Sequence, residues 1–172
     1  MYKLGTRVSY RSEGVCTVTE IRRQKFGVLN ELKDFYILSP VKDPNSKLFV
    51  PADNESLVSK MRPLCTAEEI NQLAKKLRNE KLEWIEQPRP RSNYFRELLS
   101  DGNREMLILL IHTICAREEF LVPIGKHVTQ GDLLVLSRAK KMLIDEFSVT
   151  TDITTEQRLI SVINCESECE DI

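Results

Sequence analysis

The chain has 172 residues, of which 41% are hydrophobic and 30% are charged, and its formal net charge is −1. A chain of this length and composition can bury a hydrophobic core in one domain or in two small ones. Its longest apolar run, Met106 to Ile111, is far shorter than the roughly 20 residues of a membrane span, and no charged-then-apolar leader opens it, so we expect a soluble, cytoplasmic protein.

The net charge conceals an asymmetry along the chain. Residues 1–141 contain 24 Lys and Arg against 18 Asp and Glu, whereas residues 142–172 contain 1 against 8. A mildly basic body suits a polyanion or an acidic protein surface as partner, or serves only solubility. We interpret the acidic end, residues 165–172, as a solvated tail.

Residues 1 to about 58 have the pattern of short strands separated by turns. Glycines and the sequence DPNS at 43–46 supply the breaks between them. Strands are expected where β-branched and aromatic residues alternate or run together, at 6–10, 15–21, 34–38 and 47–50. This pattern predicts a small, strongly bent sheet or partial barrel.

From Cys65 the hydrophobic period becomes that of helices. Thr66 with Glu69 three residues later is the signature of a capping box, so a helix should begin there. Pro88 and Pro90 argue against a helix through their own segment. The helices that follow are expected over 92–99, over about 104–120, from about 129 to 147 and after 154.

Strands in the first part and helices in the second indicate an α+β chain with two segregated domains. We place a sheet domain at residues 1–60, a separate all-α domain at 61–164 and the acidic tail at 165–172.

The sequence offers no catalytic site. It lacks the GxxxxGK[ST], GxGxxG and GxSxG patterns. His112 lies in the most apolar helix, where a core histidine is favoured, and His127 lies in a polar loop. The five cysteines contain no CxxC pair and form a poor disulfide or zinc framework, with Cys165 and Cys169 left open as a soft-metal or redox pair. We expect a non-enzymatic protein without cofactor or metal.

An ordered set of motifs resembles the CarD/CdnL family of bacterial transcription regulators. YKLGTRVSYRSEGVCTVTEI at 2–21, FYIL at 35–38 and KLFVP at 47–51 resemble the N-terminal RNA polymerase-interaction module that this family shares with the transcription-repair coupling factor. RELLSDGNREMLILLIHT at 96–113 and LSRAKKMLIDEF at 136–147 are similar to the helical domain of its low-G+C Gram-positive branch. The resemblance spans roughly residues 2–149.

This resemblance implies a Tudor-like bent sheet that binds the β-subunit lobe of RNA polymerase. The stretch KLFVP suits an edge strand that extends a partner's sheet through backbone hydrogen bonds. The side chains expected at the polymerase are Arg22, Arg23, Lys25, Lys47 and Phe49. A solvated turn remains the alternative for the basic run at 22–25.

The resemblance also implies a helical domain that contacts promoter DNA at the upstream edge of the transcription bubble, stabilises the open complex and has no catalytic activity. Family members carry a tryptophan that wedges against a base pair there. Trp84 is the only tryptophan of the chain, and an anchor that packs the two domains together is its other possible role.

Arg89 and Arg91 lie in a proline-restricted segment, which lowers the entropy lost when they are held against phosphates. Contacts of this kind are largely independent of DNA sequence. The expected DNA-contacting residues are Trp84, Arg89, Arg91, Lys126, Arg138, Lys140 and Lys141. We expect a monomer that regulates transcription; the alternative is a protein-interaction module that binds polymerase and recruits another factor without touching DNA.

Overall fold

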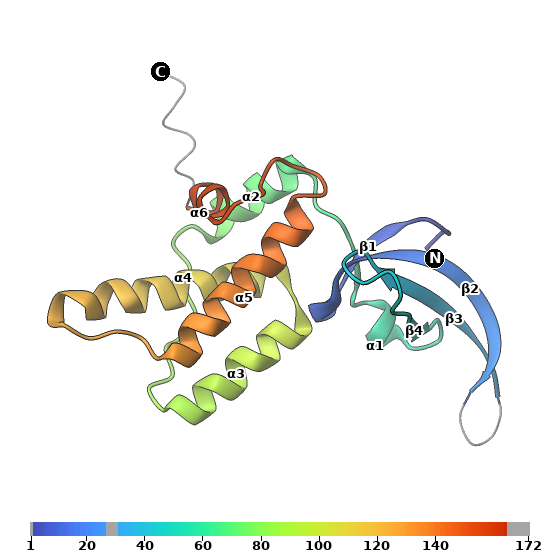
Figure 1. Cartoon of the computed structure of the whole chain (residues 1–172), viewed down its shortest axis with the longest axis horizontal. Coiled ribbons are helices and arrows are strands. Elements are labelled where there is room, and N and C mark those ends of the chain that lie inside the picture. Colours follow the sequence, from blue (N-terminus) through green and yellow to red (C-terminus); the bar gives the residue numbers. More distant parts are fainter. Residues whose placement is uncertain (1, 27–30, 165–172) are drawn as a thin grey trace. The chain divides into compact units, whose positions relative to one another are not determined.

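The computed structural model describes residues 2–26 and 31–164. The chain divides into two compact units, Met1–Leu64 and Cys65–Ile172, called here the sheet unit and the helical unit (Figure 1). The division falls four residues later than the expected boundary after residue 60, because Met61–Pro63 pairs with the sheet as a strand. The acidic tail, with Cys165 and Cys169, lies outside the described residues.

The sheet unit is one antiparallel sheet with the strand order β4-β3-β2-β1-β5. Figure 1 shows β2 and β3 as the long, curved strands. The KLFVP segment is an edge strand, as predicted, since β4 pairs only with β3 among the described strands. The elements are β1 (Arg7–Tyr10), η1 (Arg11–Glu13), β2 (Gly14–Phe26), β3 (Glu31–Pro40), β4 (Leu48–Pro51), α1 (Glu55–Val58) and β5 (Met61–Pro63).

One face of the sheet carries the core of this unit, because alternate residues of a strand point to the same side. The buried side chains of this core are Val8, Tyr10, Cys16, Val18, Tyr36, Leu38, Val50 and Met61. Burial raises the pKa of the Cys16 thiol to about 12, so this cysteine stays protonated and serves as a small core residue.

The helical unit packs its helices around α4, the most apolar of them. Its elements are α2 (Ala67–Leu77), α3 (Pro88–Asp101), α4 (Arg104–Leu121), η2 (Val122–Ile124), α5 (Gln130–Phe147) and α6 (Glu156–Ile163). The predicted capping box at Thr66 is present, and Thr129 forms a second one with Asp132. The α+β order, a sheet followed by helices, is confirmed.

The prediction that helix α3 begins only at Ser92 is wrong. The helix begins at Pro88 and contains both prolines in its first turn. There a missing N–H costs nothing, because the first four N–H groups of a helix have no intrahelical partner, and the fixed φ of proline suits the helix. Consequently Arg89 and Arg91 lie two residues apart on a helix and point to opposite sides.

The described helices include none that combines the length and apolar character needed to cross a membrane.

Candidate functional site

The face of the sheet opposite the core has an apolar patch of its own. Glu20, Ile37 and Phe49 lie opposite one another on β2, β3 and β4. The ring of Phe49 packs edge-on against Phe35, with centroids 6.4 Å apart. Phe35 and Ile37 are each 1% exposed, whereas Phe49 is 47% exposed. Phe49 is therefore the outer, solvent-facing residue of this patch.

Two of the predicted cations flank Phe49 on this side of the sheet. Arg22 donates a hydrogen bond to Glu20, and Lys47 Nζ lies 3.3 Å from the other carboxylate oxygen of Glu20. The hydrogen bond from Arg22, assisted by that from Lys47, lowers the pKa of the Glu20 carboxyl. We call the surface formed by Glu20, Arg22, Phe35, Ile37, Lys47 and Phe49 the Phe49 face.

Arg23 and Lys25 lie on the other side of the sheet. They alternate with Arg22 along β2, and Arg23 Nε is 3.9 Å from Asp34 on the neighbouring strand. Successive residues of a strand point to opposite faces. The structure thus brings together three of the five residues predicted at the polymerase, Arg22, Lys47 and Phe49, and separates the other two from them.

Trp84 packs inside the helical unit. Its indole is half-buried and meets the ring of Phe95 edge-on, with centroids 6.1 Å apart. The guanidinium carbons of Arg91 and Arg117 lie 4.4 Å and 5.2 Å from the indole centroid. Leu82, two residues earlier, donates its N–H to the hydroxyl of Thr113 on α4 at 2.8 Å. The indole is therefore held by α3 and α4 rather than standing free.

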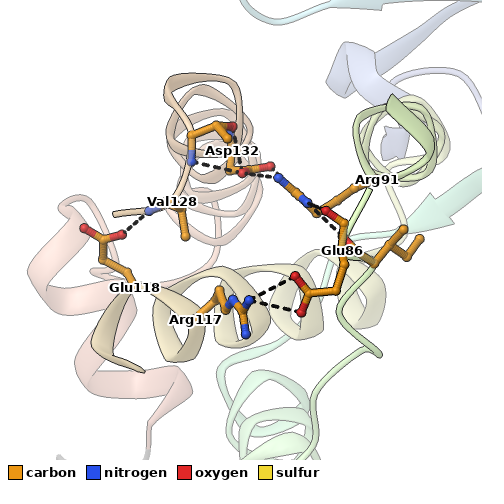
Figure 2. Close-up of polar contacts among 8 residues, drawn as sticks. Glu86, Arg91, Arg117, Glu118, Val128 and Asp132 are labelled. Carbon is orange, nitrogen blue, oxygen red and sulfur yellow. Dashed lines mark hydrogen bonds and ion pairs between the residues drawn. The ribbon is translucent and has the colours of Figure 1, made fainter. Parts of the chain in front are cut away.

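Arg91 is buried with a bidentate partner (Figure 2). Its Nε and Nη2 donate to the two carboxylate oxygens of Asp132 at 3.0 Å and 2.9 Å, and both side chains are 5% exposed. Its Nη1 donates to the carbonyl oxygens of Ile85 and Glu86 at 2.8 Å and 3.0 Å. Burial alone would raise the pKa of Asp132, but hydrogen bonds from Arg91 and Thr129 outweigh it and lower that pKa.

The structure therefore places Arg91 inside the helical unit, whereas a contact with a DNA phosphate was expected at its surface. Its guanidinium is bound by Asp132 and by two backbone carbonyl oxygens, because the helical geometry of α3 turns it inward toward α5 while Arg89 faces solvent.

Arg117 and Glu118 of α4 form further hydrogen bonds with the segments next to Arg91 and Asp132. Arg117 Nη2 donates to both carboxylate oxygens of Glu86 at 3.0 Å and 3.1 Å, and its guanidinium carbon lies 5.5 Å from the ring centroid of Phe120. Glu118 accepts the N–H of Val128 at 2.7 Å (Figure 2). That backbone hydrogen bond, together with His127, lowers the pKa of Glu118.

Three residues in this part of the helical unit were not predicted from the sequence as site residues: Asp132, Arg117 and Phe120. The spacing of Thr129 and Asp132 carried a signal, since Thr-x-x-Asp resembles a capping box. No local pattern marks the approach of Arg117 to Trp84, which depends on how α4 packs.

Four of the predicted DNA-contacting cations are exposed. Arg138 and Lys141 are three residues apart on α5 and share its exposed side. Lys140 points elsewhere, with its Nζ 3.1 Å from Glu156 of α6. The exposed cations are Arg89, Lys126, Arg138 and Lys141.

His112 is a core histidine, as expected. It is 8% exposed, and its Nδ1 lies 3.4 Å from the carbonyl oxygen of Glu80. Burial lowers its pKa. Over residues 2–26 and 31–164, no group of three or more His, Cys, Asp and Glu side chains is placed to hold a metal ion.

The family model of the CarD-like/TRCF RID domain matches residues 2–64. No curated protein matches the chain. The matched segment ends at Leu64, where the sheet unit ends, and it contains the Phe49 face and the edge strand β4. The sheet unit is therefore a CarD-like/TRCF RID domain, an RNA polymerase-interacting module.

Proposed function

We propose that this protein is a transcription regulator. In this proposal the sheet unit binds the β-subunit lobe of RNA polymerase, and the helical unit contacts promoter DNA at the upstream edge of the bubble and stabilises the open complex. The observation that carries the proposal is the match of residues 2–64 to the RID domain. Such a regulator acts as a monomer in the cytoplasm, bound to polymerase at the nucleoid.

The polymerase contact combines a backbone edge with one apolar anchor. The free edge of β4 offers its N–H and C=O groups to a strand of the partner. Phe49, on the same strand, is 47% exposed and rests on the buried ring of Phe35, so it is held in place before the partner arrives. Arg22 and Lys47 share the carboxylate of Glu20 on the same face, so the three side chains together carry one net positive charge, which favours an acidic rim on the partner.

Binding of the full-length chain to the isolated β lobe tests this contact. Phe49→Ala should weaken binding by at least about tenfold, as expected when a central aromatic anchor is truncated. Ile21→Ala is the matched control, because Ile21 is 46% exposed and lies on the other face of the sheet, opposite Tyr36. Equal losses in the two variants would remove the Phe49 face from the proposal.

The DNA contact relies on the exposed cations of the helical unit, Arg89, Lys126, Arg138 and Lys141. Contacts to phosphates release counterions, so binding of a forked promoter template should fall steeply as salt rises. In this proposal Trp84 acts from its half-buried position beside Phe95. Trp84→Ala should therefore shorten the lifetime of the open complex, and an unchanged lifetime would end its part in the proposal.

The alternative function, recruitment of another factor without DNA contact, is favoured by one observation. Arg91 and Trp84, two of the seven residues expected at DNA, are held inside the helical unit. If binding of the forked template does not change with salt concentration, this alternative is supported.

A further inference from the structure

Four planar side chains form a continuous run of contacts in the helical unit. Arg91 lies over Trp84 at 4.4 Å, Arg117 over Trp84 at 5.2 Å, and Arg117 over Phe120 at 5.5 Å, each measured from the guanidinium carbon to the ring centroid. Contacts of this kind are cation–π interactions, which extend to about 6 Å. We call Arg91, Trp84, Arg117 and Phe120 the planar run.

The two guanidinium groups of the planar run are fixed by carboxylates. Asp132 holds Arg91 through two hydrogen bonds, and Glu86 holds Arg117 (Figure 2). Because Glu86 also supplies a carbonyl oxygen to Arg91, the segment that carries Trp84 is tied to both arginines. The run is therefore ordered before a ligand binds, which reduces the entropy lost on binding.

The two ends of the planar run differ in exposure. Arg91 is 4% exposed, whereas Phe120 is 65% exposed although a guanidinium already lies over its ring. Because Arg117 covers one side of the ring, an exposure of 65% means that the other side is open to solvent. Phenylalanine has no polar group to satisfy there, so the open ring is surface suited to another flat, apolar group.

The backbone of Lys126 comes close to the end of α4 that carries Phe120. The backbone N–H of Lys126 donates to the carbonyl oxygen of Leu121, the residue after Phe120, at 3.1 Å. Lys126 is exposed. The nearby carboxylate of Glu118 is occupied by the N–H of Val128 and by His127. Glu119, directly before Phe120, is also exposed. An anion attached to a flat apolar group on the ring would therefore have Lys126 as its favourable partner.

We propose that Phe120 is a stacking platform for an unpaired base of single-stranded DNA, with Lys126 at the adjacent phosphate. Every base has a π-face, so aromatic rings bind single strands with little sequence preference. This inference deepens the proposed function and rests on it, because unpaired bases meet the helical unit only where the duplex opens. The base would extend the planar run by one further planar group.

Titration of the full-length chain with a thymidine oligonucleotide of about 12 nucleotides tests the platform. Trp84 is the only tryptophan and lies one guanidinium away from Phe120, so its fluorescence reports binding. Phe120→Ala should weaken binding about 5- to 150-fold, the loss expected for one stacked base, whereas Phe120→Tyr should retain it. Val122→Ala is the matched control, since Val122 is 50% exposed and lies outside the planar run.

Lys126→Ala separates the phosphate contact from the stack. It should weaken binding of the oligonucleotide and reduce the slope of log affinity against log salt by about 0.7, the value for one phosphate of a single strand. Phe120→Ala should leave that slope unchanged, because stacking releases no counterions. An unchanged slope in Lys126→Ala overturns the assignment of the phosphate contact.

The outcomes distinguish this inference from the proposed function. If Phe120→Ala binds the oligonucleotide with the affinity of the wild-type protein, while the wild-type protein still prolongs open complexes, the platform is overturned and the proposed function stands. If the original chain binds the β lobe but no form of DNA, both the platform and the DNA part of the proposed function fall. If Phe120→Ala weakens only the capture of polymerase, the ring is a protein contact and the platform is overturned.

Discussion

The sheet unit and the helical unit use their charged side chains differently. The sheet unit pairs its charges at the surface, as in Lys33 with Asp53 and Lys47 with Glu20. The helical unit buries the pairs Arg91 with Asp132 and Arg104 with Glu146. An exposed pair contributes only about 0–1 kcal/mol, whereas breaking a buried pair leaves a charge without its partner. The described pairs of the sheet unit thus stay at the surface, where a partner can exchange them, whereas the helical unit commits Arg91 and Arg104 to its own packing and keeps other charges exposed, such as the pair of Lys76 with Glu105.

The largest effect should come from breaking the buried pair. Arg91→Ala should lower the free energy of unfolding of the helical unit by about 3–5 kcal/mol, because it leaves the Asp132 carboxylate buried and unpaired. Denaturant unfolding followed by the fluorescence of Trp84 measures this unit alone. Arg89→Ala, two residues away and exposed, should stay within about 0.5 kcal/mol. Similar losses in both variants would contradict the inward placement of Arg91.

A second effect concerns pH and the buried His112. Burial lowers its pKa in the folded chain below the ordinary value of 6.5. Its stabilising contribution is therefore fully present above pH 6.5 and is lost as pH falls toward the folded pKa. The slope from this one group cannot exceed about 1.4 kcal/mol per pH unit.

Unfolding of the original chain and of His112→Phe at pH 7.5 and pH 5.5 measures that contribution. The original chain should lose more stability than the variant on acidification, with the loss in the helical unit. A loss of the same size in both proteins would show that His112 is not the titrating group.

A smaller effect should separate two helix caps of the helical unit. Thr66→Ala should cost about 1 kcal/mol, the usual contribution of an N-cap side chain. Thr129→Ala should cost more, because the Thr129 hydroxyl also donates to Asp132 at 2.7 Å and so supports the carboxylate that holds Arg91. Thermal unfolding of both variants, with Thr→Ser at each site as control, decides whether the second cap carries this added role.

The smallest effect on stability should occur in the sheet unit. Lys47→Ala and Lys25→Ala should each change the free energy of unfolding by less than about 0.5 kcal/mol, since both lysines are exposed. Binding to the polymerase β lobe should nevertheless weaken in Lys47→Ala only, because Lys25 lies on the other side of the sheet. Equal weakening of binding in both variants would show that the polymerase contact is not confined to the Phe49 face.

Much of the fold followed from local patterns. The capping box at Thr66, the apolar period of α4 and the turn before KLFVP predicted where elements begin, and the structure has them there. The start of α3 was mispredicted because proline forbids the interior of a helix but suits its first turn. Because the helix was predicted to start four residues too late, Arg91 was expected to be exposed like Arg89. In a helix that starts at Pro88, the two side chains point to opposite sides.

The sequence by itself determined the order of sheet and helices, the helix caps, the edge strand and the identity of the RID domain, since hydrophobic period, turn chemistry and family motifs are local features. Only the tertiary structure decided which charged side chains are buried against a partner and which are exposed. Arg91 meets Asp132 across 41 residues, and Arg117 reaches Trp84 and Phe120 through the packing of α4. Such pairs depend on distances between elements, which no local pattern encodes.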